Sequence, residues 1–263
     1  MVYLNRCLLV ILAGAGVFAG NALALEWSDT EVQYLRGREF REPYNPEHVG
    51  KQTVTFQHAD GHVYGRNFLF IDALKSNDKD ASASEFYGEG YASLSLGKLS
   101  GTSWAYGMVR DLNLTAGINY GHKSYSTHSV DPRVLLPGIT VDLNLPGFAF
   151  FNVDLLAYID RGRFAGNDNG CNADTYQLTP VWKLPFSIAG EKFSFEGFID
   201  VIGAHGNCVR QVLSQPQLRW DIGNHFGLSD KLYLGIEYQF WNNKYGVRGV
   251  RESFPEALLV WKF

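Results

Sequence analysis

The most constraining feature of this 263-residue sequence is a strand-like alternation of apolar and polar residues, repeated in segments of about ten residues. Successive side chains of a strand point to opposite faces, so a period of two indicates strands with one apolar and one polar face. Turn signals separate twelve such segments. They lie near residues 31–37, 51–59, 62–74, 85–97, 104–120, 133–143, 148–160, 175–186, 192–204, 211–222, 231–242 and 256–263.

The first 24 residues have the composition of a secretory signal peptide. Arg6 supplies a positive charge, residues 8–19 are apolar, and Ala22-Leu23-Ala24 is a small-x-small cleavage site. We therefore expect a cleaved signal peptide over 1–24 and a mature domain over 25–263. A single transmembrane helix is the alternative, but its apolar run is shorter than the roughly 20 residues that span a bilayer.

After residue 24, no apolar run of the sequence approaches the length of a transmembrane helix. A chain that enters lipid without such helices must form a closed barrel, because only then are all backbone groups hydrogen-bonded. Aromatic residues make up 14% of the chain and charged residues 19%, as expected for a barrel with aromatic girdles. The sequence predicts an all-β fold, a transmembrane antiparallel up-and-down β-barrel of about 12 strands.

The connections between the segments alternate in length. Tight turns are expected at 59–61, 98–101, 144–147, 189–191 and 227–230, and longer polar segments at 38–50, 75–84, 121–132, 161–174, 205–210 and 243–255. Outer-membrane barrels combine short periplasmic turns with long outside loops. We therefore expect both termini on the periplasmic side of the outer membrane of a Gram-negative bacterium.

The last segment shows the clearest alternation. An aromatic C-terminal residue with apolar residues at alternate positions resembles the signal that the outer-membrane insertion machinery reads, so this machinery and outer-membrane lipid are expected partners. A soluble strand that ends by chance in an aromatic residue is the alternative. We expect lipid to contact Ala257, Leu259, Trp261 and Phe263, and the interior to contain Glu256, Leu258, Val260 and Lys262.

The same parity places many ionisable residues inside the barrel. A solid core would not hold so many charges, since each unpaired buried charge costs several kcal/mol, whereas a water-filled lumen would. Twelve strands enclose a narrower channel than the 16–18 strands of general porins, which favours passage of small solutes. The predicted inward residues are Glu89, Tyr91, Asp142, Asp154, Glu196, Asp200, Arg219, Asp221 and Glu237.

The segment 63–72 gives the sharpest indication of a binding surface. Its charged face also contains Phe68 and Phe70, between Arg66 and Asp72. If this face is directed inward, the rings line the pore, where aromatic faces can stack on nucleobases and carboxylates can accept hydrogen bonds from hydroxyl or amino groups. The alternative is that Phe68 and Phe70 face lipid, and parity alone leaves both orientations open.

Cys171 and Cys208 are the cysteines that remain after the signal peptide, and both fall in predicted outside loops. An even pair in an oxidising compartment predicts a disulfide. Closing a loop of about 37 residues would stabilise the fold by roughly 3–4 kcal/mol in the loop-entropy model. Two free thiols are the alternative. Two thiols without a nearby histidine pair do not predict a zinc site, and we expect no metal and no other cofactor.

We expect no enzymatic activity, because the sequence lacks a phosphate-binding loop, a paired-histidine metal helix and a nucleophile elbow. An outer-membrane lipid hydrolase is an alternative function. Its candidate residues lie in a predicted loop, the segment 121–132, and the sequence pattern places no acidic partner beside the histidine to orient it. They are His122, Ser124, His128 and Ser129. The 27 acidic against 23 basic residues give no indication of a nucleic-acid partner.

Three stretches, 67–72, 86–99 and 256–263, resemble the Tsx-like nucleoside-specific channel family, which includes the OmpK phage-receptor porins. The resemblance implies a narrow, monomeric twelve-stranded barrel that passes nucleosides and deoxynucleosides passively. It also implies, as in several members, a possible use as a phage or colicin receptor.

Four predicted lumen residues match the resembling stretches by position. Phe68, Phe70 and Asp72 match the aromatic-and-aspartate strand of the family, and Glu89 matches an inward acid. The other predicted substrate-binding residues rest on parity alone, namely Arg66, Tyr91, Asp154 and Arg219. A receptor or structural barrel with a plugged lumen is the alternative, because Arg219 and the acids could pair across the lumen.

Overall fold

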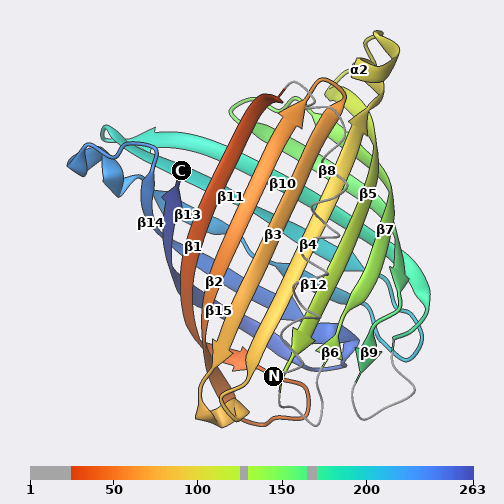
Figure 1. The fold of residues 1–263 in the computed structure, drawn as a ribbon, viewed down its shortest axis with the longest axis vertical. Coiled ribbons are helices and arrows are strands. Elements are labelled where there is room, and N and C mark those ends of the chain that lie inside the picture. Colours follow the sequence, from red (N-terminus) through yellow and green to blue (C-terminus); the bar gives the residue numbers. More distant parts are fainter. Residues whose placement is uncertain (1–24, 125–129, 165–170) are drawn as a thin grey trace, which may run out of the picture.

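The computed structural model describes residues 25–124, 130–164 and 171–263, so the predicted signal peptide, His128 and Ser129 lie outside the described residues. Twelve antiparallel wall strands close into a barrel, as predicted (Figure 1). Closure is made by the pairings β1–β15 and β10–β11. The wall strands are β1 (Leu25–Arg41), β2 (His48–His62), β3 (Gly65–Ser76), β4 (Ser84–Ser95), β5 (Val109–Lys123), β7 (Arg133–Leu143), β8 (Phe150–Asp160), β10 (Asp174–Ile188), β11 (Glu191–Ile202), β12 (Gln211–Ser214) continued by β13 (Gln217–Trp220), β14 (Leu232–Asn242) and β15 (Arg251–Lys262).

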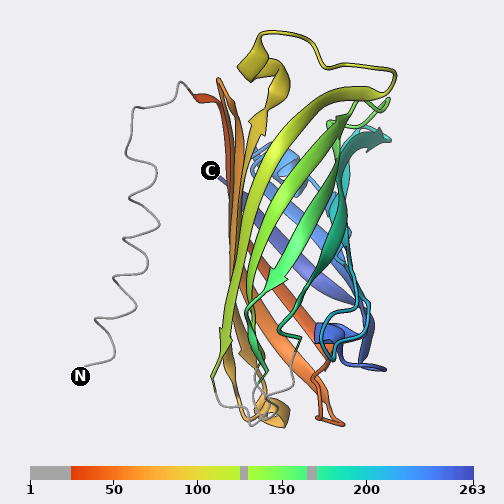
Figure 2. The same cartoon turned by 90° about the vertical axis from the view of Figure 1, so that its right-hand side faces the viewer.

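The remaining elements are short and lie at the two ends of the barrel. We call the end that holds Leu25, Phe263 and the connection 96–108 the turn end, and the opposite end the loop end (Figure 2). None of the helices in the described residues is long and apolar enough to cross a membrane. These elements are η2 (Asp78–Asp80), α2 (Leu96–Ser100), β6 (Val130–Asp131), β9 (Arg163–Phe164), η3 (Ile222–Phe226) and η4 (Lys244–Gly246).

The two faces of the wall differ as the sequence predicts. In β15, Leu259 and Trp261 are 42% and 38% exposed on the outer surface, whereas Leu258 and Val260 are buried inside. β15 pairs with β1 through Leu35–Leu258 and Val32–Trp261, so the last strand to be made closes against the first. The alternation is therefore set by lipid on one side and by the lumen on the other.

The structure corrects two of the predicted tight turns. The chain remains in strand through Ala59-Asp60-Gly61, and the turn follows at residues 63–64 because His62 still pairs with Gly65. Lys98–Gly101 is not a tight turn but belongs to the long connection 96–108. Its helix α2 is capped at the N-terminus by Ser95, whose side chain accepts a hydrogen bond from the Lys98 N–H, and at the C-terminus by Gly101 with φ = 65°.

The predicted strand 211–222 is interrupted. It consists of β12 and β13, separated by Gln215 and Pro216, and residue 222 already belongs to η3. Proline has no N–H to donate to the ladder, so pairing on that side is lost at Pro216. The Pro216 carbonyl still accepts from the Tyr238 N–H at 2.9 Å, which keeps the interrupted strand in the wall.

A lysine–carboxylate cluster holds the loop end together. Glu42, from the loop 42–47, lies within 2.6 Å of the Lys51 ammonium, 3.0 Å of Lys123 and 3.2 Å of Lys244. Burial alone would raise the pKa of the Glu42 carboxyl, but the three ammonium groups hold that pKa well below its usual range. The cluster consists of Glu42, Lys51, Asp80, Glu85, Lys123, Lys244 and Glu252.

The predicted disulfide between Cys171 and Cys208 is present, with the two Cα atoms 5.1 Å apart. It joins the loop after β8 to the loop after β11. Both sulfur atoms lie against the Tyr245 carbonyl, at 3.6 and 3.7 Å. Gly246 has φ = 74°, and a Cβ at this position would meet the Cys208 Cβ at 2.4 Å, so a glycine is required there. The disulfide thus packs on the segment that carries Lys244.

We predict that Cys171→Ser lowers the free energy of unfolding by about 3–4 kcal/mol. The disulfide joins residues that are 37 apart in sequence, and without it the unfolded chain regains the conformational entropy that this crosslink removes. The measurement is urea denaturation in detergent micelles. Cys208→Ser should have the same effect, and dithiothreitol should add nothing to either variant. Equal midpoints for the wild type and both variants would contradict a stabilising disulfide.

We predict that Glu42→Gln destabilises the barrel at pH 7 by roughly 3–5 kcal/mol, the range for breaking a buried ion pair, because three buried ammonium groups lose their shared partner. Since the pKa of Glu42 is depressed, its contribution is present above the ordinary value of 4.5 and is lost as the pH falls further. The difference from wild type should therefore shrink in acid, as followed by thermal unfolding.

The matched control is Glu47→Gln in the same loop. The Glu47 side chain is 58% exposed and its carboxylate lies 3.7 Å from the Lys79 ammonium, so loss of this charge should cost no more than about 1 kcal/mol. If the unfolding temperature fell equally in both variants, the ion pairs of Glu42 with the three lysines would not be the cause of the destabilisation.

Candidate functional site

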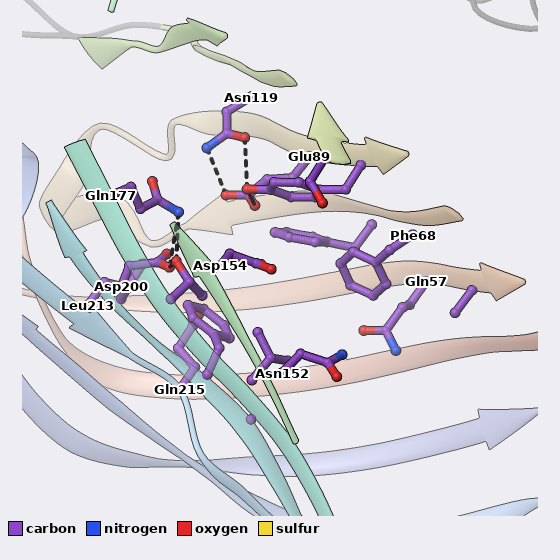
Figure 3. Close-up of a pocket in the computed structure, with 18 of the residues that line it drawn as sticks. Gln57, Phe68, Glu89, Asn119, Asn152, Asp154, Gln177, Asp200, Leu213 and Gln215 are labelled. Atoms are coloured by element: carbon purple, nitrogen blue, oxygen red, sulfur yellow. Dashed lines mark hydrogen bonds between the residues drawn. The ribbon is translucent and has the colours of Figure 1, made fainter. Parts of the chain in front are cut away.

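The barrel encloses one large cavity of about 1380 Å³. All twelve wall strands contribute side chains to it, and its lining extends from Lys98 and Trp104 at the turn end to His205 and Lys244 at the loop end. Figure 3 shows the middle of this cavity, where side chains from opposite walls face one another. We refer to this cavity as the lumen.

One wall of the lumen is aromatic. Strand β3 directs Phe68 and Phe70 into the lumen rather than toward lipid, with their ring centroids 6.0 Å apart. Tyr87 of β4 continues the wall at 5.9 Å from Phe70. The register pairs Phe68 with Tyr91 and Phe70 with Glu89, so aromatic and acidic side chains alternate on this surface.

The carboxylates beside these rings are held by neutral donors. Glu89 accepts hydrogen bonds from the hydroxyls of Tyr87 and Tyr91 and, at 3.0 Å, from the Asn119 amide. Asp72 accepts from the Thr55 hydroxyl at 2.5 Å. These bonds fix the direction of each carboxylate, and no lysine, arginine or histidine nitrogen of the described residues lies within 4.0 Å of either one.

The far side of the lumen repeats the pattern. Asp154 accepts from the Thr140 hydroxyl at 2.5 Å, and Asp200 accepts from Thr179 at 2.5 Å and from Gln177 at 3.2 Å. All of these side chains come from inward positions of their strands. The predicted residues Phe68, Phe70, Asp72, Glu89, Tyr91 and Asp154 therefore meet around one space, as Figure 3 illustrates for those that it labels.

The two predicted arginines lie in different surroundings. Arg66 forms a two-pronged pair with Asp142, with N–O distances of 2.7 and 2.8 Å. Arg219 forms the same kind of pair with Glu31 at 2.9 and 3.0 Å, and its Nε lies 3.2 Å from Glu196. Both guanidinium groups are thus neutralised against the wall, and such bidentate pairs fix geometry strongly.

Sequence reasoning did not single out several polar residues that line the same space. They share the inward parity of their strands, so alternation could have found them, but no charge drew attention to them. Amides and hydroxyls of this kind both donate and accept hydrogen bonds. These residues are Gln57, Tyr87, Asn119, Asn152, Tyr158 and Gln215.

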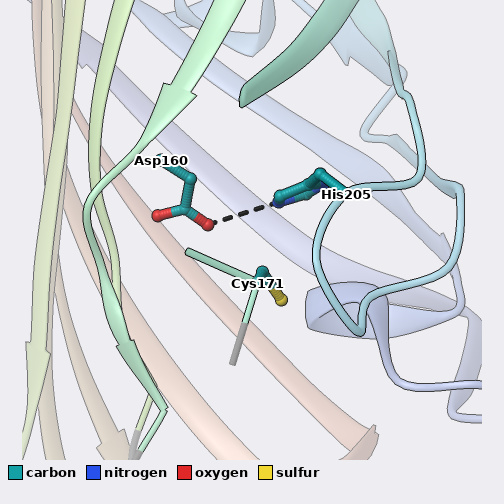
Figure 4. A group of neighbouring side chains, drawn as sticks. All are labelled: Asp160, Cys171 and His205. Atoms are coloured by element: carbon teal, nitrogen blue, oxygen red, sulfur yellow. Dashed lines mark hydrogen bonds and ion pairs between the residues drawn. The ribbon is translucent and has the colours of Figure 1, made fainter. Parts of the chain in front are cut away.

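Two groups of possible metal ligands occur in the described residues. Asp160, Cys171 and His205 have ligand atoms within 4.8 Å of one another (Figure 4), but the Cys171 sulfur is bonded to Cys208. Burial opposes protonation of His205, yet its hydrogen bond to Asp160 raises the pKa of the imidazole. The other group is Glu42, Asp80 and Glu85, whose oxygens already contact the lysines of the cluster.

For the hydrolase alternative, the structure shows an acidic residue beside the candidate histidine that the sequence analysis did not identify. The His122 Nδ1 lies 3.0 Å from the Asp131 carboxylate. The Ser124 hydroxyl, however, donates to the Ser84 carbonyl at 3.0 Å rather than to a histidine. Within the described ranges, no serine is hydrogen-bonded to His122, so no nucleophile–base pair is formed there.

Comparison with known proteins identifies the family. The model of the family described as "Nucleoside-specific channel-forming protein, Tsx" matches residues 57–254, which are 198 of the 263 residues. No curated protein matches the sequence.

Solved outer-membrane barrels are similar in outline only. A KdgM porin has 9% identity and a TM-score of 0.48 over 89% of this chain and 99% of its own. The translocator domain of the autotransporter NalP from Neisseria meningitidis has 11% identity and a TM-score of 0.45 over 99% and 96%. From the match of the family model to three quarters of its length, this chain belongs to the family of nucleoside-specific channel-forming proteins, Tsx.

Proposed function

We propose that this outer-membrane channel passes nucleosides and deoxynucleosides passively down their concentration gradients. The observation that carries the proposal is the aromatic wall of Phe68, Phe70 and Tyr87, with the carboxylates of Asp72 and Glu89 directly beside it. Family membership supports the same class of solute.

A nucleoside has one flat aromatic part and one part rich in hydroxyl groups. The rings of Phe68 and Phe70 offer faces for the base, and such stacking is worth about 1–3 kcal/mol per base in single-strand binders. Asp72, Glu89 and Asp154 offer acceptors for ribose hydroxyls and exocyclic amines. A channel needs contacts of this moderate strength, because a solute must leave the site as readily as it enters.

The predicted contact residues divide into two groups. We assign solute contact to Phe68, Phe70, Asp72, Glu89, Tyr91 and Asp154, which surround one space. Arg66 and Arg219 are assigned a positioning role, since their ion pairs with Asp142 and Glu31 hold the wall on either side of that space.

The proposed cellular setting follows from the predicted alternation of short and long connections. We infer that the turn end faces the periplasm and the loop end faces outward in a Gram-negative bacterium, with the C-terminal residues as the signal for the insertion machinery. One barrel encloses a complete lumen, so a monomer suffices. The loops tied by Cys171 and Cys208 offer a fixed outer surface, and a phage receptor role there stays a prediction.

The alternative of a receptor or structural barrel with a plugged lumen makes a different prediction. The positive charges in the wall are paired with carboxylates on the wall itself, and the cavity lining reaches from one end to the other. This supports an open lumen. A plugged barrel would give no conductance in planar bilayers.

We predict that liposomes containing the protein swell faster in adenosine or thymidine than in a sugar of equal size, because the aromatic wall raises nucleoside occupancy in the lumen. The measurement is light scattering after osmotic mixing, with protein-free liposomes as the blank. Equal swelling rates for nucleosides and sugars would remove the claim of nucleoside selectivity and leave only a general pore.

We predict that Phe68→Ala and Phe70→Ala each weaken nucleoside block of the single-channel current by about five- to 150-fold, the equivalent of losing 1–3 kcal/mol of stacking. The matched control is Phe56→Ala. This residue lies on β2, the neighbouring strand, but its ring is 40% exposed on the outer surface. Equal loss of block in all three variants would mean that the rings act through the wall rather than by contact with the base.

A further inference from the structure

Six carboxylates in the middle part of the lumen lack a cationic partner; a seventh, Asp111, lies beside α2 at the turn end, where it accepts hydrogen bonds from the Ser95 hydroxyl and the Gly97 N–H. In the part of the chain that the structure describes, no lysine, arginine or histidine nitrogen lies within 4.0 Å of any of them. Their hydrogen-bond donors, where they have any, are hydroxyls and amides. We call these residues the acidic band: Asp72, Glu89, Asp154, Asp200, Glu237 and Glu256.

The members of the acidic band lie near one another around the lumen. Glu237 and Glu256 are cross-strand partners near the middle of β14 and β15. Asp200 reaches the level of Asp154, because its hydrogen-bond donor Thr179 is the registered partner of Asp154. The carboxyl groups are also close enough to interact electrostatically. Asp72 interacts with Glu89 and Glu237, and Glu89 interacts with Asp154 and Asp200.

The fixed positive charges of the wall are, by contrast, already neutralised. Each lysine or arginine that a wall strand directs into the lumen lies within 4.0 Å of a carboxylate outside the acidic band. The pairs are Lys51 with Glu42 and Glu85, Arg66 and Arg110 with Asp142, Lys123 with Asp80, Lys183 with Glu196, and Arg219 with Glu31. No wall cation therefore remains to balance the acidic band.

A second observation points to a positively charged or donor-rich occupant. Five buried side-chain polar atoms lack a partner among the described residues, and four of the five are acceptor oxygens. Three of these belong to lumen residues, namely Gln177 Oε1, Gln239 Oε1 and Glu256 Oε2. Glu256 is only 3% exposed, so its free oxygen is an unpaired acceptor held in the wall. Buried acceptors of this kind need a donor or a cation.

We propose that the acidic band is a binding site for monovalent cations and makes the channel selective for cations over anions. Rings of carboxylates select cations in other channels, because they replace part of the hydration shell and raise the local cation concentration. The fixed charges of the band lie in a narrow lumen with low-dielectric walls, which strengthens this field. The inference rests on the proposed function only in requiring an open lumen.

The test is the reversal potential of single channels in a tenfold KCl gradient across a planar bilayer. We expect K⁺ to permeate about fivefold or more better than Cl⁻, since one unit charge at 4 Å changes ion occupancy by about this factor even in bulk water. The triple variant Asp200→Asn, Glu237→Gln and Glu256→Gln should bring the ratio close to one. Glu256→Gln alone, which breaks no hydrogen bond of the free oxygen, should lower the ratio partly.

The matched control removes the same charge outside the lumen. Glu39→Gln, Glu47→Gln and Asp78→Asn neutralise three acids of the loop end that do not line the cavity, and the permeability ratio should stay at the wild-type value. A wild-type ratio near one, a preference for Cl⁻, or an equal shift in both triple variants would overturn the proposal.

The two proposals fail in different ways. None of the three neutralised lumen acids belongs to the proposed nucleoside contacts, so adenosine-driven swelling should persist in that triple variant. Wild-type protein that passes adenosine without preferring K⁺ contradicts the cation site alone. Wild-type protein that selects K⁺ but swells equally in nucleosides and sugars contradicts nucleoside selectivity alone.

Discussion

The closure of the strand ladder is the constraint on which the rest of the structure depends. Within lipid no water satisfies a free N–H or C=O, so every wall strand must have a partner on both sides. β1 and β15 meet that requirement by pairing, as do β10 and β11. Closure also explains why the interruption at Pro216 is tolerated, because the neighbouring strand β14 still donates to the Pro216 carbonyl.

Closure directs each side chain of the wall either toward lipid or toward the lumen, and most charged side chains of the wall strands face the lumen. These charged side chains are arranged differently along the barrel. Ion pairs such as Arg66–Asp142 and the cluster around Glu42 lie toward the ends. The middle contains carboxylates that accept hydrogen bonds from neutral donors. These ion pairs join strands and loops near the ends. The middle retains carboxylates without cationic partners beside Phe68 and Phe70, and we propose that a passing solute is contacted there.

Periodicity predicted the fold because a period of two reports directly on lipid and lumen. It set the faces of β15 and the existence of twelve strands, and loop position brought Cys171 and Cys208 together. It failed where the backbone leaves the ladder, as in α2 and the connection 96–108, because polar turn residues do not reveal how far a chain travels before it returns. Parity also says nothing about partners, so it did not find Asp131 beside His122.

The same limit separates the two arginines from the other predicted site residues. On parity alone, Arg66 and Arg219 are equivalent to Asp72 and Glu89, since all four point inward. The structure distinguishes them by charge balance: both guanidinium groups are saturated by wall carboxylates, whereas Asp72 and Glu89 are bound only by hydroxyls and amides. The proposed solute contacts are therefore the inward carboxylates without a cationic partner, and in this lumen they lie beside an aromatic wall.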